Sequence, residues 1–155
     1  MVFFVIVGGQ VKPEIEMPSH ATILQLKRKI EEIVKITVSR QTLRYNGNVL
    51  ENNKAISEFR FGNSATLDLS VQPLTQLRKF PVFVNSDDRE FMDIWVKERT
   101  LVASLKRKIE KHGGILAKHV NLYHLATKME DDFPLSAYYI YPGSDVEMTV
   151  SIDHT

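Results

Sequence analysis

The chain has 155 residues, 43% of them hydrophobic and 25% charged, which is the composition of an ordinary globular protein. Its 20 lysines and arginines against 19 acidic residues leave a net charge of +1, too small to indicate nucleic-acid binding from charge alone. The absence of cysteine excludes disulfides, thiol catalysis and cysteine-bound zinc and favours the cytoplasm or nucleus, and no apolar run is long enough to span a bilayer.

The hexapeptide Leu-Lys-Arg-Lys-Ile-Glu occurs twice, at residues 26–31 and 105–110. The offset of 79 residues is the size of a small domain, so the chain reads as one fold written twice. We therefore expect two domains, at residues 1–72 and 80–152. The linker between them, at residues 73–79, is too short and too apolar to be a free tether.

The first copy begins with two strands and a helix. Alternation places Phe3 and Val5 on the inner face of the first strand, and residues 15 and 17 on the inner face of the second, with a turn at Gly8-Gly9 between them. Thr22 is the expected N-terminal cap of a helix whose apolar side runs through residues 23, 26, 30 and 33 or 34.

A hairpin and a closing strand complete the first copy. Asn46-Gly47 is a strong signal for a two-residue hairpin turn, and residues 66–71 alternate as a strand. The second copy repeats this order, with Gly113-Gly114 ending its helix. Ala126 stands where the first copy has Gly47, so we expect a different type of turn there.

A constant offset of 79 predicts which residues form the two cores, because each apolar position of the first copy then falls on an apolar position of the second with no gap. The predicted pairs are Phe3 and Val82, Val5 and Val84, Ile15 and Ile94, Met17 and Val96, Ile23 and Val102, Leu26 and Leu105, Ile30 and Ile109, Leu43 and Leu122, Leu50 and Met129, Ile56 and Leu135, Phe61 and Ile140, Leu67 and Val146, and Leu69 and Met148.

These residues resemble the ubiquitin superfamily across nearly the whole chain, twice. The motifs are the T-x-x-x-L-K-x-K-I helix from residue 22, the segment L-R-Y-N-G-N-V-L-E from residue 43, and the T-L-x-L strand from residue 66. The resemblance implies an α+β protein of two tandem ubiquitin-like β-grasp domains, each a mixed four- to five-stranded sheet packed on one helix. It also implies that Lys27 and Lys106 are largely buried, with Asp131 as the ion-pair partner of Lys106.

The chain departs from ubiquitin where ubiquitin is conjugated and where it is recognised. Conjugation needs a tail ending in Gly-Gly, which the last residues lack, so the resemblance implies a non-conjugated protein. The positions that match ubiquitin's apolar recognition patch are Gly8, Arg44, Asp68 and Ser70 in the first copy and Asp87, Tyr123, Glu147 and Thr149 in the second. Each lost apolar anchor removes about 2 kcal/mol of burial. We therefore expect the first copy to bind ordinary ubiquitin receptors poorly, and the second copy to keep only Tyr123 as an anchor.

Other surfaces gain apolar residues. If Phe3 and Val5 point inward, Phe4 and Ile6 point outward from the same strand. The second copy has three outward aromatic residues on one diagonal of its first strand pair, at Phe83, Phe91 and Trp95. Such a cluster is unusual on a monomer, and aromatic residues are favoured binding anchors. The alternative is that these faces pack against the other domain or the linker.

No pattern in the sequence supports catalysis, since the five histidines lack metal-ligand spacing and neither a nucleophile elbow nor a phosphate loop occurs. We expect no enzymatic activity, cofactor, metal, membrane contact or small-molecule substrate. We interpret the chain as a monomeric adaptor for proteins, including ubiquitin–proteasome components, as the resemblance implies. Its expected contact residues are Phe4, Ile6, Arg44, Asp68, Phe83, Phe91, Trp95 and Tyr123. The alternative is a nucleic-acid-binding protein that uses its two basic helices.

Overall fold

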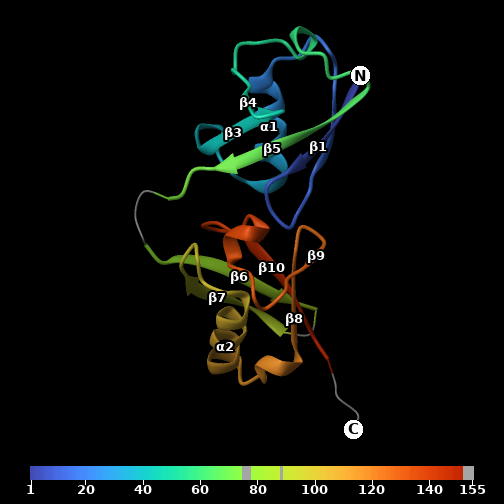
Figure 1. Ribbon diagram of the computed structural model, residues 1–155. Coiled ribbons are helices and arrows are strands. Elements are labelled where there is room, and N and C mark those ends of the chain that lie inside the picture. Colours follow the sequence, from blue (N-terminus) through green and yellow to red (C-terminus); the bar gives the residue numbers. More distant parts are fainter. Residues whose placement is uncertain (75–77, 88, 152–155) are drawn as a thin grey trace. The chain divides into compact units, whose positions relative to one another are not determined.

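The computed structural model describes residues 1–74, 78–87 and 89–151, without the side chains of residues 89–91. The chain divides into two compact units, Met1–Pro73 and Leu74–Thr155, which share one order of elements (Figure 1). The first unit contains β1 (Val2–Val7), β2 (Glu14–Met17), α1 (Ile23–Val34), β3 (Gln41–Tyr45), β4 (Asn48–Val49) and β5 (Ser64–Val71). The second contains β6 (Phe80–Ser86), β7 (Arg89–Val96), α2 (Val102–Gly113), β8 (Val120–His124), β9 (Thr127–Lys128) and β10 (Asp145–Val150).

Each unit is one mixed sheet with one long helix on its inner face. The strand orders are β2-β1-β5-β3-β4 and β7-β6-β10-β8-β9, and in each sheet the first and last strands of the unit pair in parallel at the centre. Short 3₁₀ turns lie at Val38–Arg40, Ile56–Glu58, Ala117–His119 and Leu135–Tyr138. The predicted α+β architecture of two β-grasp domains is confirmed. Within the described residues, neither helix has the length and apolar character needed to cross a membrane.

The inner face of β1 is the opposite of the one predicted. Phe4 and Ile6 are fully buried, and the ring of Phe4 packs edge-on against Phe61 with centroids 5.1 Å apart. Phe3 and Val5 are only half-buried and lie on the outer face. The expectation that Phe4 and Ile6 point outward is therefore wrong, and so are the predicted core pairs of Phe3 and Val5.

A single extra residue in the first hairpin of the second domain explains this error. Phe4 lies opposite Ile15, as Val82 lies opposite Ile94, so the first strands correspond at an offset of 78 and the second strands at 79. A slip of one residue moves every side chain of a strand to the other face. The remaining predicted pairs are buried in both domains, which confirms them.

The two helices begin with different caps. In α1 the hydroxyl of Thr22 accepts a hydrogen bond from the backbone N–H of Gln25 (3.2 Å), and the side chain of Gln25 accepts one from the N–H of Thr22 (2.9 Å). This reciprocal pair satisfies two backbone donors of the first turn and confirms the predicted cap. The matching residue of α2 is Leu101, which makes no such bond. Both helices end in a left-handed residue, Lys35 and, as predicted, Gly114.

Gly8 is required by a close approach of backbone to backbone. A Cβ atom added to Gly8 would lie 2.1 Å from the carbonyl oxygen of Leu69 on β5. Residues 64–68 of β5 pair with residues 3–7 of β1, just before these two positions, so neither strand can withdraw without breaking ladder hydrogen bonds. The glycine is therefore structural at this turn.

The two β-hairpin turns have the same backbone conformation, although different types were expected. Asn46 and Gly47 have φ angles of 50° and 82°, the pattern of a type I′ turn, for which Asn-Gly is the preferred sequence. Leu125 and Ala126 have φ angles of 49° and 61° at the same two positions. The prediction of a different turn type is wrong, because the flanking strands impose the turn and the second domain accepts two residues that disfavour it.

Replacing Leu125→Asn and Ala126→Gly together is expected to raise the free energy of unfolding of the second domain by about 1–2 kcal/mol, because left-handed strain is relieved. Urea unfolding followed by fluorescence of Trp95, the single tryptophan of the chain, measures it. The matched control, Asn46→Leu with Gly47→Ala, should destabilise the first domain by a similar amount. Amide hydrogen exchange measures the stability of that domain. An unchanged second domain would show that the turn stores no strain.

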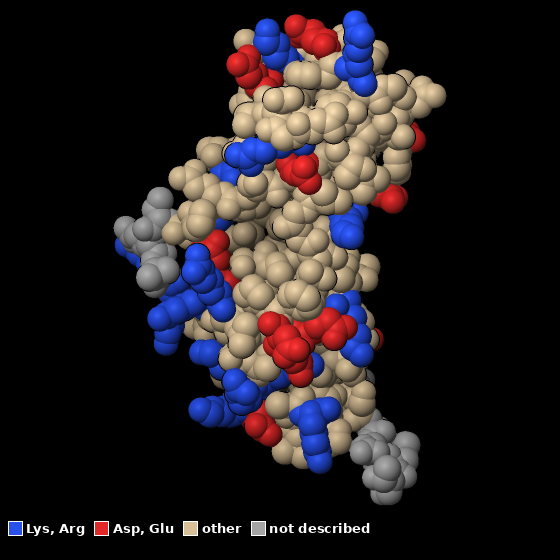
Figure 2. Space-filling model, in the orientation of Figure 1, with Lys and Arg blue, Asp and Glu red and all other residues tan. Residues whose placement is uncertain are grey.

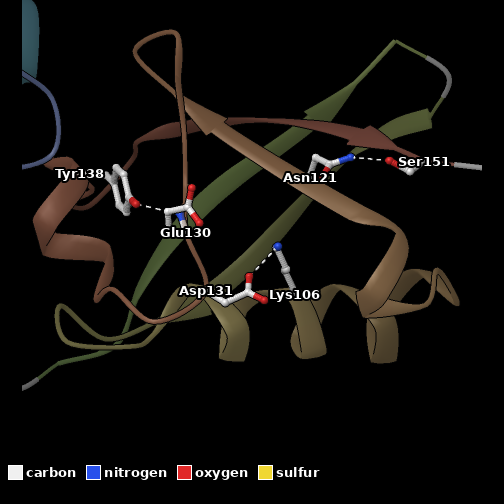
Figure 3. Close-up of polar contacts among 6 residues, drawn as sticks. All are labelled: Lys106, Asn121, Glu130, Asp131, Tyr138 and Ser151. Carbon is white, nitrogen blue, oxygen red and sulfur yellow. Dashed lines mark hydrogen bonds and ion pairs between the residues drawn. The ribbon is translucent and has the colours of Figure 1, made fainter.

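The repeated lysines differ in their partners. The ammonium of Lys106 on α2 lies 2.6 Å from a carboxylate oxygen of Asp131, as predicted (Figure 3). The loop that holds Asp131 is fixed further by the N–H of Glu130, which donates to the hydroxyl of Tyr138 at 2.7 Å. Lys27 is only 6% exposed, and no carboxylate pairs with it among the described residues. Burial lowers the pKa of Lys27 from its ordinary value of 10.5.

Methionine at the two lysines is expected to have opposite effects. Lys106→Met should lower the stability of the second domain by about 1 kcal/mol, because it removes a close ion pair from a part-buried site. Lys27→Met should raise the stability of the first domain, because a buried charge that no described carboxylate pairs with is replaced by an apolar chain. Chemical unfolding of both variants at neutral pH tests this, and equal signs would contradict it.

Candidate interaction surfaces

The outer face of the first sheet carries an apolar strip with a polar border. Phe3, Val5 and Val7 alternate outward along β1 and are half-buried. Strand register places Val5 between Glu14 on β2 and Thr66 on β5. The row Glu14–Val5–Thr66 therefore presents one carboxylate, one small apolar side chain and one hydroxyl.

The predicted residues Arg44 and Asp68 lie beside this strip. They face each other across β3 and β5, and the guanidinium of Arg44 donates to the hydroxyl of Ser70 at 2.9 Å. Asp68 is exposed and lies opposite Val7 of β1. The structure thus gathers the three polar replacements of the recognition patch on one surface, where charged and polar side chains take the place of apolar anchors.

The outer face of the second sheet combines aromatic and acidic side chains. Phe83 on β6 lies opposite Asp93 on β7 and beside Asp145 on β10. Both carboxylates are exposed, and Phe83 is half-buried. Side chains at such neighbouring positions have Cβ atoms about 4.5–5.5 Å apart. The row Asp93–Phe83–Asp145 is therefore an aromatic ring with a carboxylate on each side, at the position where the first domain has Glu14–Val5–Thr66.

An open depression of about 510 Å³ adjoins this row. Three of its lining residues, Asp87, Glu147 and Thr149, are positions matched to the ubiquitin patch, and Asp145 lines it as well. Tyr123 lies directly opposite Glu147 across β8 and β10. The surface that is apolar in ubiquitin is therefore strongly acidic here, with Tyr123 as a half-buried aromatic neighbour.

Trp95 is 55% exposed on β7, the edge strand of the second sheet. It lines a groove of about 320 Å³ whose other side is α2, together with Lys108, Lys111 and His112. The ammonium of Lys108 donates to the backbone carbonyl of Trp95 at 3.2 Å. Figure 2 shows lysine and arginine side chains over and beside α2. This side of the second domain is basic, whereas the outer face of its sheet is acidic.

The structure places the predicted contact residues unevenly. Trp95 is exposed, Phe83 and Tyr123 are half-buried on the outer face, and Arg44 and Asp68 lie together on the first domain. Phe4 and Ile6 belong to the core, and the side chain of Phe91 lies outside the described residues. Asp93 and Asp145 were not predicted from the sequence. Only the strand register reveals them, because they are far apart in sequence.

The described residues contain no group of three histidine, aspartate or glutamate side chains arranged to hold a metal ion. In particular, the acidic outer face of the second sheet does not form such a group. The predicted absence of a metal site remains a prediction for the chain as a whole.

Comparison with known proteins agrees with this architecture. The sequence profile of the Ubiquitin family matches the chain twice, over residues 3–74 and 82–153, so the chain belongs to the ubiquitin family. A solved structure similar to it is the solution structure of the N-terminal ubiquitin-like domain in the 4931431F19Rik protein. That structure has 22% identity and a TM-score of 0.48, over 53% of this chain and 84% of that chain. Tandem ubiquitin-like domains support a protein-interaction module, and such families are generally non-enzymatic.

His124, at the end of β8, is buried beneath the sheet and contacts the backbone of Asp145, a residue of the acidic face. Its ring is 6% exposed, and Nδ1 lies 2.9 Å from the backbone carbonyl oxygen of Asp145, to which the neutral imidazole donates. Its Nε2 atom is buried without a hydrogen bond among the described atoms. Burial lowers the pKa of His124 below its ordinary value of 6.5, and the bond to Asp145 only partly opposes this. The folded domain therefore favours the neutral form of His124.

The second domain is expected to lose stability as the pH falls from about 7 to 5. A folded-state pKa below the unfolded value means that the unfolded chain binds more protons in this range, with a slope of at most about 1.4 kcal/mol per pH unit. Urea unfolding followed by Trp95 fluorescence measures it. His124→Phe should remove this slope, whereas His112→Asn, on the exposed end of α2, should keep it. Equal slopes in both variants would contradict the assignment.

Proposed function

We propose that this chain is a non-enzymatic adaptor whose two ubiquitin-like domains dock onto different proteins through the outer faces of their sheets. The observation that supports it is the contrast between corresponding rows, Glu14–Val5–Thr66 in the first domain and Asp93–Phe83–Asp145 in the second. Two copies of one core carry surfaces of different chemistry, and surfaces that differ in charge and aromatic content select different partners.

Neither face suits receptors that read the apolar patch of ubiquitin. In the first domain Arg44 is hydrogen-bonded to Ser70 beside the exposed Asp68. An apolar partner would therefore remove water from these charged groups without offering them new hydrogen bonds, which costs free energy. In the second, Glu147 and Asp145 impose the same cost. We propose that each face binds a different partner protein, and that both partners are proteins of the cytoplasm or nucleus. Ubiquitin–proteasome components are among the candidates because of the family, and conjugation is not part of the proposal.

A second candidate function is nucleic-acid binding by the second domain. The observation that favours it is the groove beside β7, where the exposed Trp95 lies near Lys108 and Lys111. Lysines that contact phosphates and an aromatic ring on which a base stacks are the usual elements of single-strand binding. The carboxylate of Asp93 in the same groove and the net charge of +1 disfavour it.

The adaptor proposal predicts that the faces can be inactivated separately. The full chain, immobilised and exposed to nuclease-treated extract, should capture two sets of proteins. Val5→Glu should remove one set, because a carboxylate interrupts the apolar strip of the first domain, and Trp95→Ala should remove the other. Quantitative mass spectrometry of captured proteins measures this.

The control for that experiment is Glu51→Gln, an exposed position off both sheet faces, which should change neither set. Loss of the same proteins in both variants would overturn the two-face adaptor. Tight binding of a single-stranded oligonucleotide, abolished by Lys108→Glu with Lys111→Glu, would favour the second candidate. Trp95→Ala could instead change the rotational tumbling measured by NMR relaxation and leave the set of captured proteins unchanged. In that case the role of the tryptophan is in packing of the domains and not in partner binding.

A further inference from the structure

We infer that the row Asp93–Phe83–Asp145 is a binding site for an arginine side chain of a partner protein. This inference names the chemistry of one partner of the adaptor and therefore rests on the proposed function. It depends on the outer face of the second sheet only, so it can be tested by changes to the second domain alone.

The geometry of the row matches a guanidinium group. Phe83 lies on the outer face of β6, between the edge strand β7 and the central strand β10, and the register places Asp93 on one side of it and Asp145 on the other. A planar cation that stacks on the ring of Phe83 would have a carboxylate at each edge. Arginine is the side chain that stacks on aromatic faces and bonds to carboxylates in its own plane.

The charges around the row point to a cationic occupant. Both carboxylates are exposed, and among the described residues neither forms an ion pair with a lysine or arginine of the chain, although Asp93 also lines the groove beside α2 that contains Lys108 and Lys111. Asp87 and Glu147 extend the negative surface along the adjoining depression of about 510 Å³. Trp95 is the next outward residue after Asp93 on β7 and is 55% exposed. An apolar residue next to the arginine in the partner protein could therefore contact Trp95.

The first domain provides an internal comparison. Its corresponding row, Glu14–Val5–Thr66, has the same backbone positions but lacks the aromatic ring and one carboxylate. Stacking and two-sided charge pairing are both absent there. The site therefore belongs to the second domain alone, and its parts can be removed or transplanted without altering either core.

The test uses the uniformly ¹⁵N-labelled full chain and a short acetylated, amidated peptide with one arginine between glycine and serine residues. NMR titration should give weak binding, with shifts of amides at 83, 93 and 145 and a change in Trp95 fluorescence. The lysine peptide should bind at least threefold more weakly, and the citrulline peptide, which keeps the planar shape without the charge, at least tenfold more weakly. Raising the salt from about 50 to 500 mM should weaken arginine binding severalfold.

Matched variants decide whether the row is the site. Phe83→Val with Asp145→Thr, which copies the first domain, should weaken arginine binding at least fivefold while the amide spectrum stays folded. Asp93→Asn should weaken it as well, and Asp132→Asn, in a distant loop, should not. Val5→Phe with Thr66→Asp should create a second arginine site on the first domain.

The inference is overturned if the citrulline peptide binds as well as the arginine peptide, or if the shifts map away from the outer face. It is also overturned if the Phe83→Val, Asp145→Thr chain binds as the unchanged chain does. Such a result leaves the adaptor proposal intact, provided Trp95→Ala and Val5→Glu still remove different captured proteins. Conversely, arginine binding at the row with no separable protein sets would refute the adaptor and keep the site.

Discussion

The parallel pairing of the first and last strands is the constraint on which both domains depend. It joins the two ends of each unit at the centre of the sheet, β1 to β5 and β6 to β10, and so fixes which alternate residues face the helix. Ile6 beside Leu67 and Val84 beside Val146 are the inward pairs of these ladders, and all four are fully buried. Every outward residue, including those of both proposed faces, has its place because these pairs face inward.

Around this shared core, the two copies stabilise their ends by different local means. The first domain has a reciprocal Thr22–Gln25 cap and an Asn-Gly turn, whereas the second has an uncapped Leu101 and a left-handed Leu-Ala turn. The second domain instead pairs Lys106 with Asp131, whereas no carboxylate of the described residues pairs with Lys27 of the first. Local stabilisers are worth about 1 kcal/mol each, so a copy that loses one can retain its fold as long as the core is kept.

The sequence predicted most of the fold because its strongest signals are local. The hexapeptide repeat, the Thr22 cap, Asn46-Gly47 and Gly114 each depend on a few neighbouring residues, and the structure confirms them. The face of β1 could not be read in the same way. Residues 2–7 are all apolar, so alternation gives two equally good registers, and the offset taken from the helix selected the wrong one. The difference between the two hairpins is visible only from strand pairing.

The same limit applies to the candidate site. Trp95 could be predicted as exposed because polar residues, Asp93 and Lys97, lie two positions before and after it in the sequence. Asp145 and Asp93, in contrast, are 52 residues apart and meet only through Phe83 on the strand between them. The net charge of +1 concealed them further. That value sums the whole chain, whereas within the second domain carboxylates occupy the sheet face and lysines occupy the α2 side. A chain that is nearly neutral overall can therefore present an acidic surface and a basic one on a single domain, and a partner responds to the local field rather than to the total.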